Sequence, residues 1–416
     1  MKVYYVTAVD IAIPGGAQVN EREFVTTLIR QYPDQVHCIL PRPSTALAEL
    51  VGAPVSYLPQ APKGNLLSYL SFEWNLYQTV RKLLQEQGTD SQSILAMRPT
   101  PTTILLPWYA QRNHIAFSLR VAGAFPEPTL IRNKVPAPLV PVTSWALLES
   151  IRWRSERTTA FVAVTQTIVR QYVERLGIEA KKFTVIPNGV NIQLFTPRDQ
   201  QQTREKLGLT RFKHWIGYVG SLMGNRGISQ IIDAAKYLST LRSDIGFLIV
   251  GGGAGNEDQS TFQALVKEAG LEDQFVFVGW IPYDQVALHI GAFDIGLATF
   301  PKEKMRWSGS ASQKVRQYLA CGVPVVASRG DGHEFIQNDH LGLCIEAEDP
   351  HEFGQAILSL LELSAEQKLH HREHARQYAL DHLSMEKVVS EYMHVWASSL
   401  PQAAPHTAQN SAKQYL

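Results

Sequence analysis

A glycine-flanked turn at residues 220–227 carries the clearest candidate chemistry in the chain. Its sequence is GSLMGNRG, and it joins an apolar, strand-like run to a helical pattern that starts at Ile228. Free backbone N–H groups at a helix N-terminus favour anions, and the planar guanidinium of Arg226 matches phosphate oxygens. The turn is therefore a candidate diphosphate site with contacts from Gly220, Ser221 and Arg226. A plain strand-to-helix turn with a solvated arginine is the alternative interpretation.

The stretch SGSASQKVRQYLACGVPVVAS, residues 308–328, is a second candidate ligand-binding element. Lys314 and Gln317 lie at helical spacing, and Gly322 is suited to a left-handed cap at the helix end. The β-branched run after it predicts a strand buried on both faces of a parallel sheet. A helix whose polar start precedes such a strand commonly borders a ligand cleft, so we expect Lys314 and Gln317 to face the ligand.

Two glycines near the N-terminus and two arginines at strand ends are candidates for the opposite side of a binding site. Gly15 and Gly16 stand between a strand-like run and a helical pattern, where backbone can approach a ligand. Arg98 and Arg120 follow predicted strands, and residues at the carboxyl ends of parallel strands line the crevice of an α/β sheet. Glycines in such turns also serve packing alone, so this signal is weak by itself.

Metal-binding and nucleophile motifs are not evident in the sequence. It has neither an Asp-x-Asp pair nor a Gly-x-Ser-x-Gly elbow, and Cys38, Cys321 and Cys344 are widely spaced. His333 and Glu334 in GDGHEF are candidate catalytic groups, although a glycine-rich loop with a capping acid explains them more simply. We therefore expect neither a metal site nor a disulfide.

Composition and charge bound the class of protein. The chain has 416 residues, of which 45% are hydrophobic and 19% charged, enough for two domains with sizeable cores. Neither a membrane-spanning run nor a leader pattern is evident, which favours a cytoplasmic protein. Residues 1–190 hold 19 Lys and Arg against 13 Asp and Glu, whereas residues 191–416 hold 20 against 25. The basic half suits an anionic acceptor or peripheral contact with the inner face of a membrane; an ordinary solvated surface explains it equally well.

Strands and helices alternate along the chain in two successive runs. The Asn-Gly turn at residues 188–189 closes the first run, and a strand at 215–219 restarts the pattern. We expect an α/β protein with two Rossmann-like, doubly wound domains facing across a cleft. The predicted units are an acceptor domain over residues 1–190, a donor domain over 191–380, a helix over 381–397 that can pack back on the first domain, and a disordered tail over 398–416.

Aromatic residues recur at helical spacing in two predicted helices, residues 66–84 and 142–156. The first contains Phe72 and Trp74, and the second contains Trp145 among several arginines. If exposed, these side chains form an acceptor-binding or membrane surface. Burial of the aromatic rings, with the arginines solvated, is the expectation from ordinary core statistics.

Several motifs resemble those of the retaining glycosyltransferases of family 4, which have the GT-B fold. They are GGAQVNEREF near the N-terminus, then IPNGVN, YVGSLMGNRG, FLIVGGG, VFVGWIP and KVRQYLACGVPVVAS. The resemblance implies transfer of a sugar from a UDP- or GDP-sugar to an acceptor hydroxyl, with retention of configuration and without an obligatory metal or other cofactor. It also implies synthesis of a polysaccharide, glycolipid or glycoconjugate, with Gly252, Trp280 and Ile281 on the donor side and Gly15, Gly16 and Arg98 on the acceptor side.

The chain departs from this family pattern at positions that bear on mechanism. Ser221 stands where the family has an arginine, and Arg226 stands at the position of its lysine. The two family glutamates fall on Gly309 and Gln317, and the N-domain histidine falls on Arg120. A glutamine still hydrogen-bonds a ribose hydroxyl, but without charge assistance.

Positive charge for a leaving diphosphate is then expected from Lys304, Arg306 or Lys314, of which Lys314 matches a variant form of the family motif. The residues assigned to catalysis are Arg226, Lys314 and Arg120. An active transferase with a shifted donor site is one hypothesis. A catalytically weak GT-B protein that binds a nucleotide sugar or glycan as a partner subunit is the other, and a non-hydrolysing sugar epimerase is a distant third.

Overall fold

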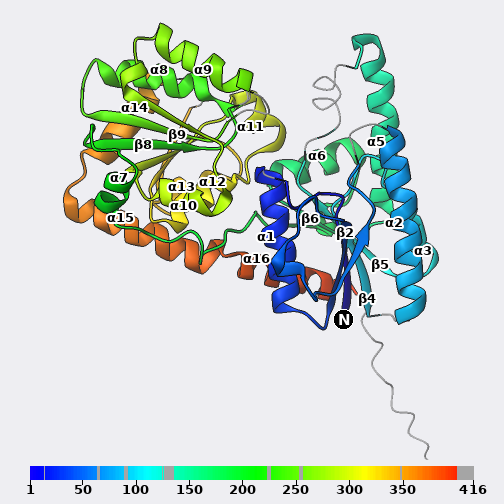
Figure 1. The fold of residues 1–416 in the computed structure, drawn as a ribbon. Helices are drawn as coiled ribbons and strands as arrows, with labels where there is room; N and C mark the ends of the chain where they lie inside the picture. The colour runs from blue at the N-terminus through cyan, green and yellow to red at the C-terminus, as the bar shows by residue number, and fades with distance from the viewer. Residues whose placement is uncertain are drawn as a thin grey trace, which may run out of the picture.

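The computed structural model shows two α/β lobes side by side (Figure 1). It describes residues 1–13, 15–62, 66–88, 92–123, 125, 135–222, 226–252, 256–346 and 349–400. The expected pair of Rossmann-like domains is therefore confirmed. The expected tail falls largely on residues 401–416, outside the described part.

The N-terminal lobe is built on a parallel sheet. In the part of the chain that the structure describes, its seven strands lie in the order β3-β2-β1-β4-β5-β6-β7. They are β1 (Lys2–Val6), β2 (Val36–Pro41), β3 (Val55–Leu58), β4 (Ser93–Met97), β5 (Ala116–Val121), β6 (Ala160–Ala163) and β7 (Phe183–Val185). The helices are α1 (Gly16–Gln31), α2 (Leu66–Gln87), α3 (Leu105–Arg112), α5 (Val140–Glu156) and α6 (Gln166–Leu176).

The C-terminal lobe repeats this plan. Its described strands lie in the order β10-β9-β8-β11-β12-β13. They are β8 (His214–Val219), β9 (Ile245–Val250), β10 (Phe275–Gly279), β11 (Ile295–Ala298), β12 (Val325–Ser328) and β13 (Gly342–Ile345). The helices are α7 (Gln200–Lys206), α8 (Ile228–Ser239), α9 (Asn256–Glu268), α10 (Tyr283–Ile290), α11 (Lys302–Ser308), α12 (Gln313–Ala320), α13 (Glu334–Asn338), α14 (Pro350–Leu361) and α15 (Ala365–Tyr378). The last helix of the chain is α16 (Met385–Ser398). Short turns of other helix types lie at Ala48–Leu50, Ala137–Leu139, Ala180–Lys182, Glu272–Gln274 and Ala379–Leu383.

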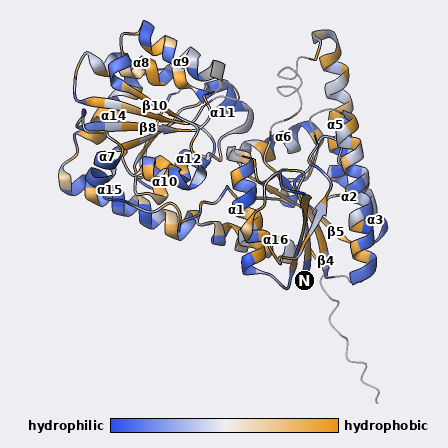
Figure 2. Cartoon of the chain, viewed as in Figure 1, coloured by the Kyte–Doolittle hydropathy of each residue, from blue (hydrophilic) through white to orange (hydrophobic). Residues whose placement is uncertain are grey.

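Each sheet has an apolar core on both faces. In the N-terminal lobe, α1 and α16 cover one face, and α2, α3, α5 and α6 cover the other. In the C-terminal lobe, α8, α9 and α14 cover one face, and α10, α12 and α15 cover the other. Figure 2 shows the consequence, with apolar strands inside each lobe and helices that are apolar on one side only.

The last helix belongs spatially to the first lobe. Helix α16 lies against α1, where the Phe24 and Tyr392 rings meet edge to face at 4.8 Å. The indole Nε1 of Trp396 donates a hydrogen bond of 3.2 Å to Ser118 Oγ on β5. The chain therefore crosses back from the second lobe and closes one face of the first sheet.

The expected burial of the aromatic side chains is wrong for two of them. Phe72 is buried, but Trp74 and Trp145 are exposed. Arg154, expected in solvent, is buried and donates a 2.7 Å hydrogen bond to the carbonyl of Thr100. None of the described helices combines the length and the apolar run needed to cross a bilayer.

Candidate functional site

Three cationic side chains from separate elements surround the ring of Phe300. The ammonium Nζ atoms of Lys304 and Lys314 lie 3.6 and 5.4 Å from the ring centroid, and the guanidinium carbon of Arg226 lies 6.0 Å from it. Lys304 is on α11, Lys314 is in the first turn of α12, and Arg226 precedes α8. The turn at 220–227 and the stretch at 308–328, far apart in sequence, therefore meet at one site.

These cations have no acidic partner among the described residues. Lys314 is only 9% exposed, its Nζ lies 3.6 Å from the centre of the Tyr218 ring, and that Nζ makes no hydrogen bond within the described chain. The Nε of Arg226 is likewise buried without a partner in that part. Aromatic faces stabilise the cations only in part, so the site is poised for an anion.

Burial and mutual repulsion weaken proton binding at both lysines. Burial, and then the charge of Arg226, lower the pKa of Lys304 to about 7. Burial, Arg226 and Lys304 together hold the pKa of Lys314 well below its usual value. A bound anion would reverse this effect, because it stabilises the charged form of each lysine.

Arg306, the third cation considered from the sequence, is exposed and does not belong to this cluster. His333 is fully buried, and its ring centroid lies 5.9 Å from the ring centroid of Phe300 in the cation cluster. Burial lowers the pKa of His333 to about 4, so the ring is neutral at pH 7. Glu334 accepts a 2.7 Å hydrogen bond from the amide of Gly332, consistent with the loop-capping interpretation.

Gly220 and Gly252 have no side chain that would fill the space beside Lys314 and Trp280. Gly220 has a φ of 142°, and a Cβ there would lie 3.2 Å from Lys314 Nζ. At Gly252 a Cβ would lie 2.7 Å from the Trp280 indole, which is 54% exposed beside it. Ile281 follows and is half-buried. The predicted donor-side residues thus lie along one edge of the C-terminal sheet, where β8, β9 and β10 end.

The two positions without the family glutamates have different environments. Gln317 is buried on α12, within one helical turn of Lys314. Gly309 has a φ of 58°, and a Cβ there would lie 3.0 Å from a carboxylate oxygen of Asp331. The side chain of Asp331 therefore fills the space beside Gly309. Sequence reasoning missed Asp331, Phe300 and Tyr218, because their proximity depends on how separate elements pack.

Arg120 and Arg98 lie in a buried network of the N-terminal lobe. Their guanidinium groups donate hydrogen bonds of 2.9 and 3.1 Å to the same carboxylate oxygen of Glu21 on α1. Tyr5 donates to the other oxygen at 2.6 Å. Burial raises the pKa of Glu21, but the two arginines outweigh burial and leave that pKa lowered. The side chain of Arg120 is 3% exposed, and both arginines are bound to Glu21 of their own lobe, with no contact to Arg226, Lys304 or Lys314 in the described chain. Glu21 was not identified from the sequence, although it lies in the GGAQVNEREF motif.

Gly15 and Gly16 start α1 near the junction of the lobes. One turn into this helix, the Asn20 amide donates to Asn188 Oδ1 at 3.1 Å. Asn188 in turn donates to the carbonyl of Ala311, between α11 and α12, at 2.8 Å. The predicted acceptor-side glycines are therefore linked through two side chains to the segment that carries Lys314. Pro14 lies outside the described residues.

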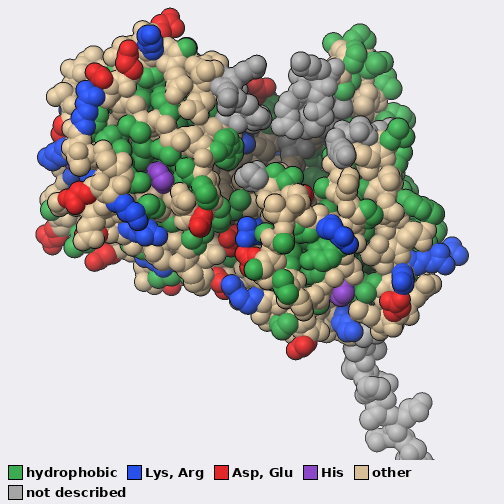
Figure 3. Space-filling model, viewed as in Figure 1, with side chains coloured by type: hydrophobic (Ala, Val, Ile, Leu, Met, Phe, Trp, Pro, Cys, Tyr) green, Lys and Arg blue, Asp and Glu red, His purple; other side chains and the backbone are tan. Residues whose placement is uncertain are grey.

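Helix α6 of the N-terminal lobe fixes the position of this segment. Thr165 Oγ1 donates a 2.9 Å hydrogen bond to the carbonyl of Ser308, and the Gln171 amide donates to the carbonyl of Trp307. The carboxylate of Asp331 accepts a hydrogen bond from the backbone N–H of Thr167 in the first turn of α6. Figure 3 shows a hollow between the two lobes above this junction.

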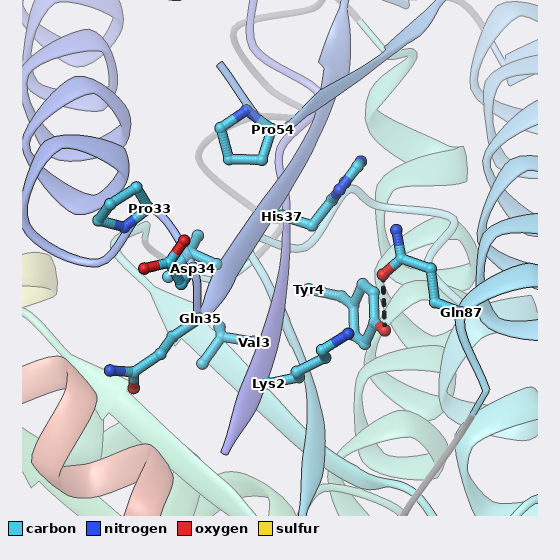
Figure 4. Close-up of a pocket in the computed structure, with 10 residues that line it drawn as sticks. Lys2, Val3, Tyr4, Pro33, Asp34, Gln35, His37, Pro54 and Gln87 are labelled. Carbon is cyan, nitrogen blue, oxygen red and sulfur yellow. Dashed lines mark hydrogen bonds between the residues drawn. The ribbon is translucent and has the colours of Figure 1, made fainter. Parts of the chain in front are cut away.

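A separate pocket of about 200 Å³ lies at the other end of the first sheet. Figure 4 shows Tyr4, His37 and Gln87 around it, beside the N-terminal ends of β1 and β2. Its lining does not include Arg226, Lys304 or Lys314. Within the described ranges, no group of three or more His, Cys, Asp and Glu residues is arranged to hold a metal ion.

Two parallel-sheet Rossmann-like domains, joined so that a site lies between them, define the GT-B class of fold. A family model described as Glycosyltransferase Family 4 matches residues 14–194, and one described as Glycosyl transferases group 1 matches residues 213–363. The chain therefore belongs to the family 4 glycosyltransferases, as the motif resemblance predicted.

Curated relatives match the chain over part of their length. The D-inositol 3-phosphate glycosyltransferase of Acidothermus cellulolyticus is 30% identical over 208 residues, which cover 48% of this chain and 45% of the relative. A GDP-mannose-dependent monoacylated alpha-(1-6)-phosphatidylinositol monomannoside mannosyltransferase of Corynebacterium glutamicum is 26% identical, over 52% of this chain and 58% of the relative. The chain thus spans about half the length of the curated relatives it matches.

Solved structures match the fold over nearly the whole chain. Anabaena HepE in complex with UDP aligns with a TM-score of 0.71 and 17% identity, covering 96% of this chain and 100% of that one. The sucrose-phosphate synthase of Thermosynechococcus elongatus gives a TM-score of 0.73 and 16% identity, covering 96% and 99%. At these identities the likeness concerns the fold alone.

Proposed function

We propose that the protein is a retaining glycosyltransferase that moves a sugar from a UDP- or GDP-sugar to an acceptor hydroxyl in glycolipid or polysaccharide synthesis. The observation that carries this proposal is the cluster of Arg226, Lys304 and Lys314, which has no carboxylate partner in the described chain. A nucleoside diphosphate supplies the anion that such a cluster lacks. The printed names of the relatives, one of them GDP-mannose-dependent, and the UDP bound to Anabaena HepE support the same ligand class.

The cations have a direct role in the proposed reaction. Cleavage of the sugar–phosphate bond leaves negative charge on the diphosphate, and prepositioned positive charge stabilises the transition state. Lys314 lies beside Gly220, where the diphosphate would lie, and Arg226 and Lys304 add positive charge around the Phe300 ring. We therefore expect the reaction to proceed without a metal ion.

The donor's other parts are assigned to neighbouring residues. The exposed ring of Trp280 offers a face for the nucleobase, and Gln317 offers an amide for ribose hydroxyls. The acceptor approaches from the N-terminal lobe, at the end of α1 that begins with Gly15 and Gly16. Arg98 and Arg120 donate hydrogen bonds to the carboxylate of Glu21 and so stabilise the position of α1 on this acceptor side.

A second function is supported by the missing carboxylates. Gly309 and Gln317 replace acids that the family uses at the donor, and no carboxylate of the described residues forms an ion pair with Arg226, Lys304 or Lys314. A chain that binds a nucleotide sugar or glycan tightly but transfers slowly, as the partner of another subunit, fits these replacements.

Lys314 provides the test of the first proposal. Incubation of the purified protein with UDP- and GDP-sugars and candidate acceptors should release nucleoside diphosphate, in EDTA as well as in buffer alone. Lys314→Met should lower kcat/KM by roughly 100-fold, since it removes prepositioned charge from the leaving group. Lys236→Met, at an exposed lysine on α8, is the matched control and should leave the rate unchanged.

Two results would contradict this proposal, the first against transfer and the second against the assigned diphosphate site. Tight donor binding by calorimetry without release across the whole panel supports the binding subunit instead. Equal rates for Lys314→Met and the control would mean that the diphosphate lies away from the cation cluster.

A further inference from the structure

A small cavity lies at the other end of the C-terminal sheet from Phe300. Its volume is about 60 Å³, several times the roughly 10–15 Å³ that one water molecule needs. Asp294 and Pro324 line it and precede β11 and β12, whereas Phe300 follows β11. The cavity is therefore separate from the cation cluster around Phe300.

Three basic side chains on one face of α15 line this cavity. Lys368, His371 and Arg372 stand at positions i, i+3 and i+4, which are neighbours on a helix surface. Figure 1 shows α15 along the lower edge of the C-terminal lobe, where it leads toward α16. Leu360 and Leu361 at the end of α14 form an apolar wall of the cavity. The basic groups thus face a space in which charges are screened less than in bulk water.

Arg372 has no acidic partner in the part of the chain that the structure describes. Its guanidinium is half-buried and forms neither an ion pair nor a hydrogen bond with those residues. Burial and the charge of Arg204 lower the pKa of Arg372, and the charge of Asp294 offsets this only in part. The guanidinium therefore lies where an additional anion would stabilise it.

Asp294 is the one acid among the described residues that line the cavity, and other groups already bind it. Its Oδ2 accepts hydrogen bonds of 2.6 Å from Arg204 and 2.7 Å from the backbone amide of Trp215. The Nδ1 of His214 lies 3.7 Å from the same oxygen. Because Arg204 neutralises this carboxylate, the charges of Lys368 and Arg372 are left without an acid.

Two further groups of the lining have hydrogen-bonding capacity left. The Nδ1 of His371 is buried and makes no hydrogen bond within the described chain. The ammonium of Lys368 donates one hydrogen bond of 2.6 Å to the carbonyl of Leu361, and it has three N–H groups in all. A buried polar atom without a partner costs free energy, so a ligand that satisfies it is favoured.

We propose that this cavity binds inorganic phosphate, held by Arg372, Lys368 and His371. The planar fork of Arg372 matches two phosphate oxygens, and Lys368 donates to a third. His371 donates from Nδ1, in the tautomer that carries its proton there. This inference goes beyond the proposed transfer reaction and does not depend on it, because neither donor nor acceptor takes part.

Equilibrium dialysis of the full chain against radiolabelled phosphate tests the proposal. The cation cluster at Phe300 can also attract phosphate, so the measurement uses a chain with Arg226→Gln and Lys314→Gln as its background. This background should retain one phosphate per chain. Adding Arg372→Gln should weaken binding at least about tenfold, because the bidentate contact is lost. Adding Lys236→Gln instead, at an exposed lysine on α8, should leave binding unchanged.

Competition and a conservative variant make the test specific. Sulfate should displace the labelled phosphate, because its shape and charge are similar, whereas acetate at the same concentration should not. Arg372→Lys keeps the charge but not the fork, so it should bind phosphate with intermediate affinity, and circular dichroism verifies that each variant is folded.

Two outcomes would overturn the proposal. One is equal phosphate binding with and without Arg372→Gln in the folded background chain. The other is binding of one phosphate by the wild type and none by the background chain, which would assign the anion to the cation cluster alone.

Discussion

At the scale of single residues, the unusual feature is positive charge buried against aromatic rings. Lys314 lies over Tyr218, and Lys304 lies over Phe300, without a neutralising acid in the described chain. The sequence alone identified Arg226 and Lys314, because Arg226 lies in a glycine-flanked turn and Lys314 lies near the start of a predicted helix. It could not identify Phe300 or Tyr218 as the walls, because these positions depend on the packing of β8, β11 and α12.

Because Lys304 is buried, we expect the affinity for UDP to fall as pH rises from 7 to 9. The pKa of Lys304 is lowered to about 7 in the free protein, so this group loses its charge over that range. A diphosphate binds the protonated form, and binding then takes up a proton, so the dissociation constant should increase roughly tenfold or more across the range. Isothermal titration calorimetry in buffers of different ionisation enthalpy measures both the affinity and the proton uptake.

Lys304→Met provides the control for this pH dependence. The variant should bind UDP more weakly at pH 7 and show a flatter pH profile, because its titrating group is absent. A UDP affinity that stays constant between pH 7 and 9 in the wild type would contradict the assignment.

The lowered pKa of Lys304 also affects folding. In the unfolded chain a lysine keeps its proton up to about pH 10.4, whereas in the folded chain Lys304 loses it near pH 7. The free energy of unfolding should therefore increase as pH rises from about 7 to about 10.4.

At the scale of elements, the regular units were predictable and the short irregular ones were not. The strand expected at residues 215–219 and the helix expected at 66–84 follow clear apolar patterns, and the structure has both close to these residues, as β8 and α2. Strand β3 follows a proline-rich passage and was not predicted, because its four residues form an edge strand that is held by pairing with β2. Helix α11 and strand β13 are also short, so tertiary contacts decide them more than local pattern does.

Helix α16 shows how an element at the end of the chain stabilises the beginning. Trp396 is 1% exposed, packs near Tyr5 and Phe24, and bonds to Ser118. Trp396→Ala should therefore lower the free energy of unfolding by about 3–5 kcal/mol, as truncation of a buried aromatic residue usually does. Urea denaturation, followed by circular dichroism, measures this loss.

Leu369→Ala, on the exposed face of α15, is the comparison for the Trp396 variant. It should change the free energy of unfolding by less than about 0.5 kcal/mol, as surface substitutions usually do. If Trp396→Ala were equally mild, α16 would not be an integral part of the N-terminal fold.

At the scale of the whole molecule, the site is assembled by the way that the two lobes meet. The hydrogen bonds from α6 to residues 307 and 308, and from Asn188 to residue 311, connect the N-terminal lobe to the segment that carries Lys304 and Lys314. The sequence predicts two domains facing across a cleft, but not which side chains join them. Those contacts depend on the relative placement of two separately folded sheets, which local pattern does not encode.

Asp331 is the charged member of this junction, and its removal should shift the molecule toward a more open arrangement. Its carboxylate accepts a hydrogen bond from the Thr167 amide in the first turn of α6, where the positive end of the helix dipole adds to the attraction. Such charge-assisted bonds contribute about 1.5–3 kcal/mol, so Asp331→Ala should favour opening by roughly tenfold or more. Small-angle scattering of the free protein should show a larger radius of gyration for Asp331→Ala, and addition of UDP should reduce the difference. Asp273→Ala, which removes an exposed carboxylate that pairs with Arg211, should scatter as the wild type does. Identical curves for Asp331→Ala and the wild type would mean that the neutral contacts of α6 hold the lobes together without the carboxylate.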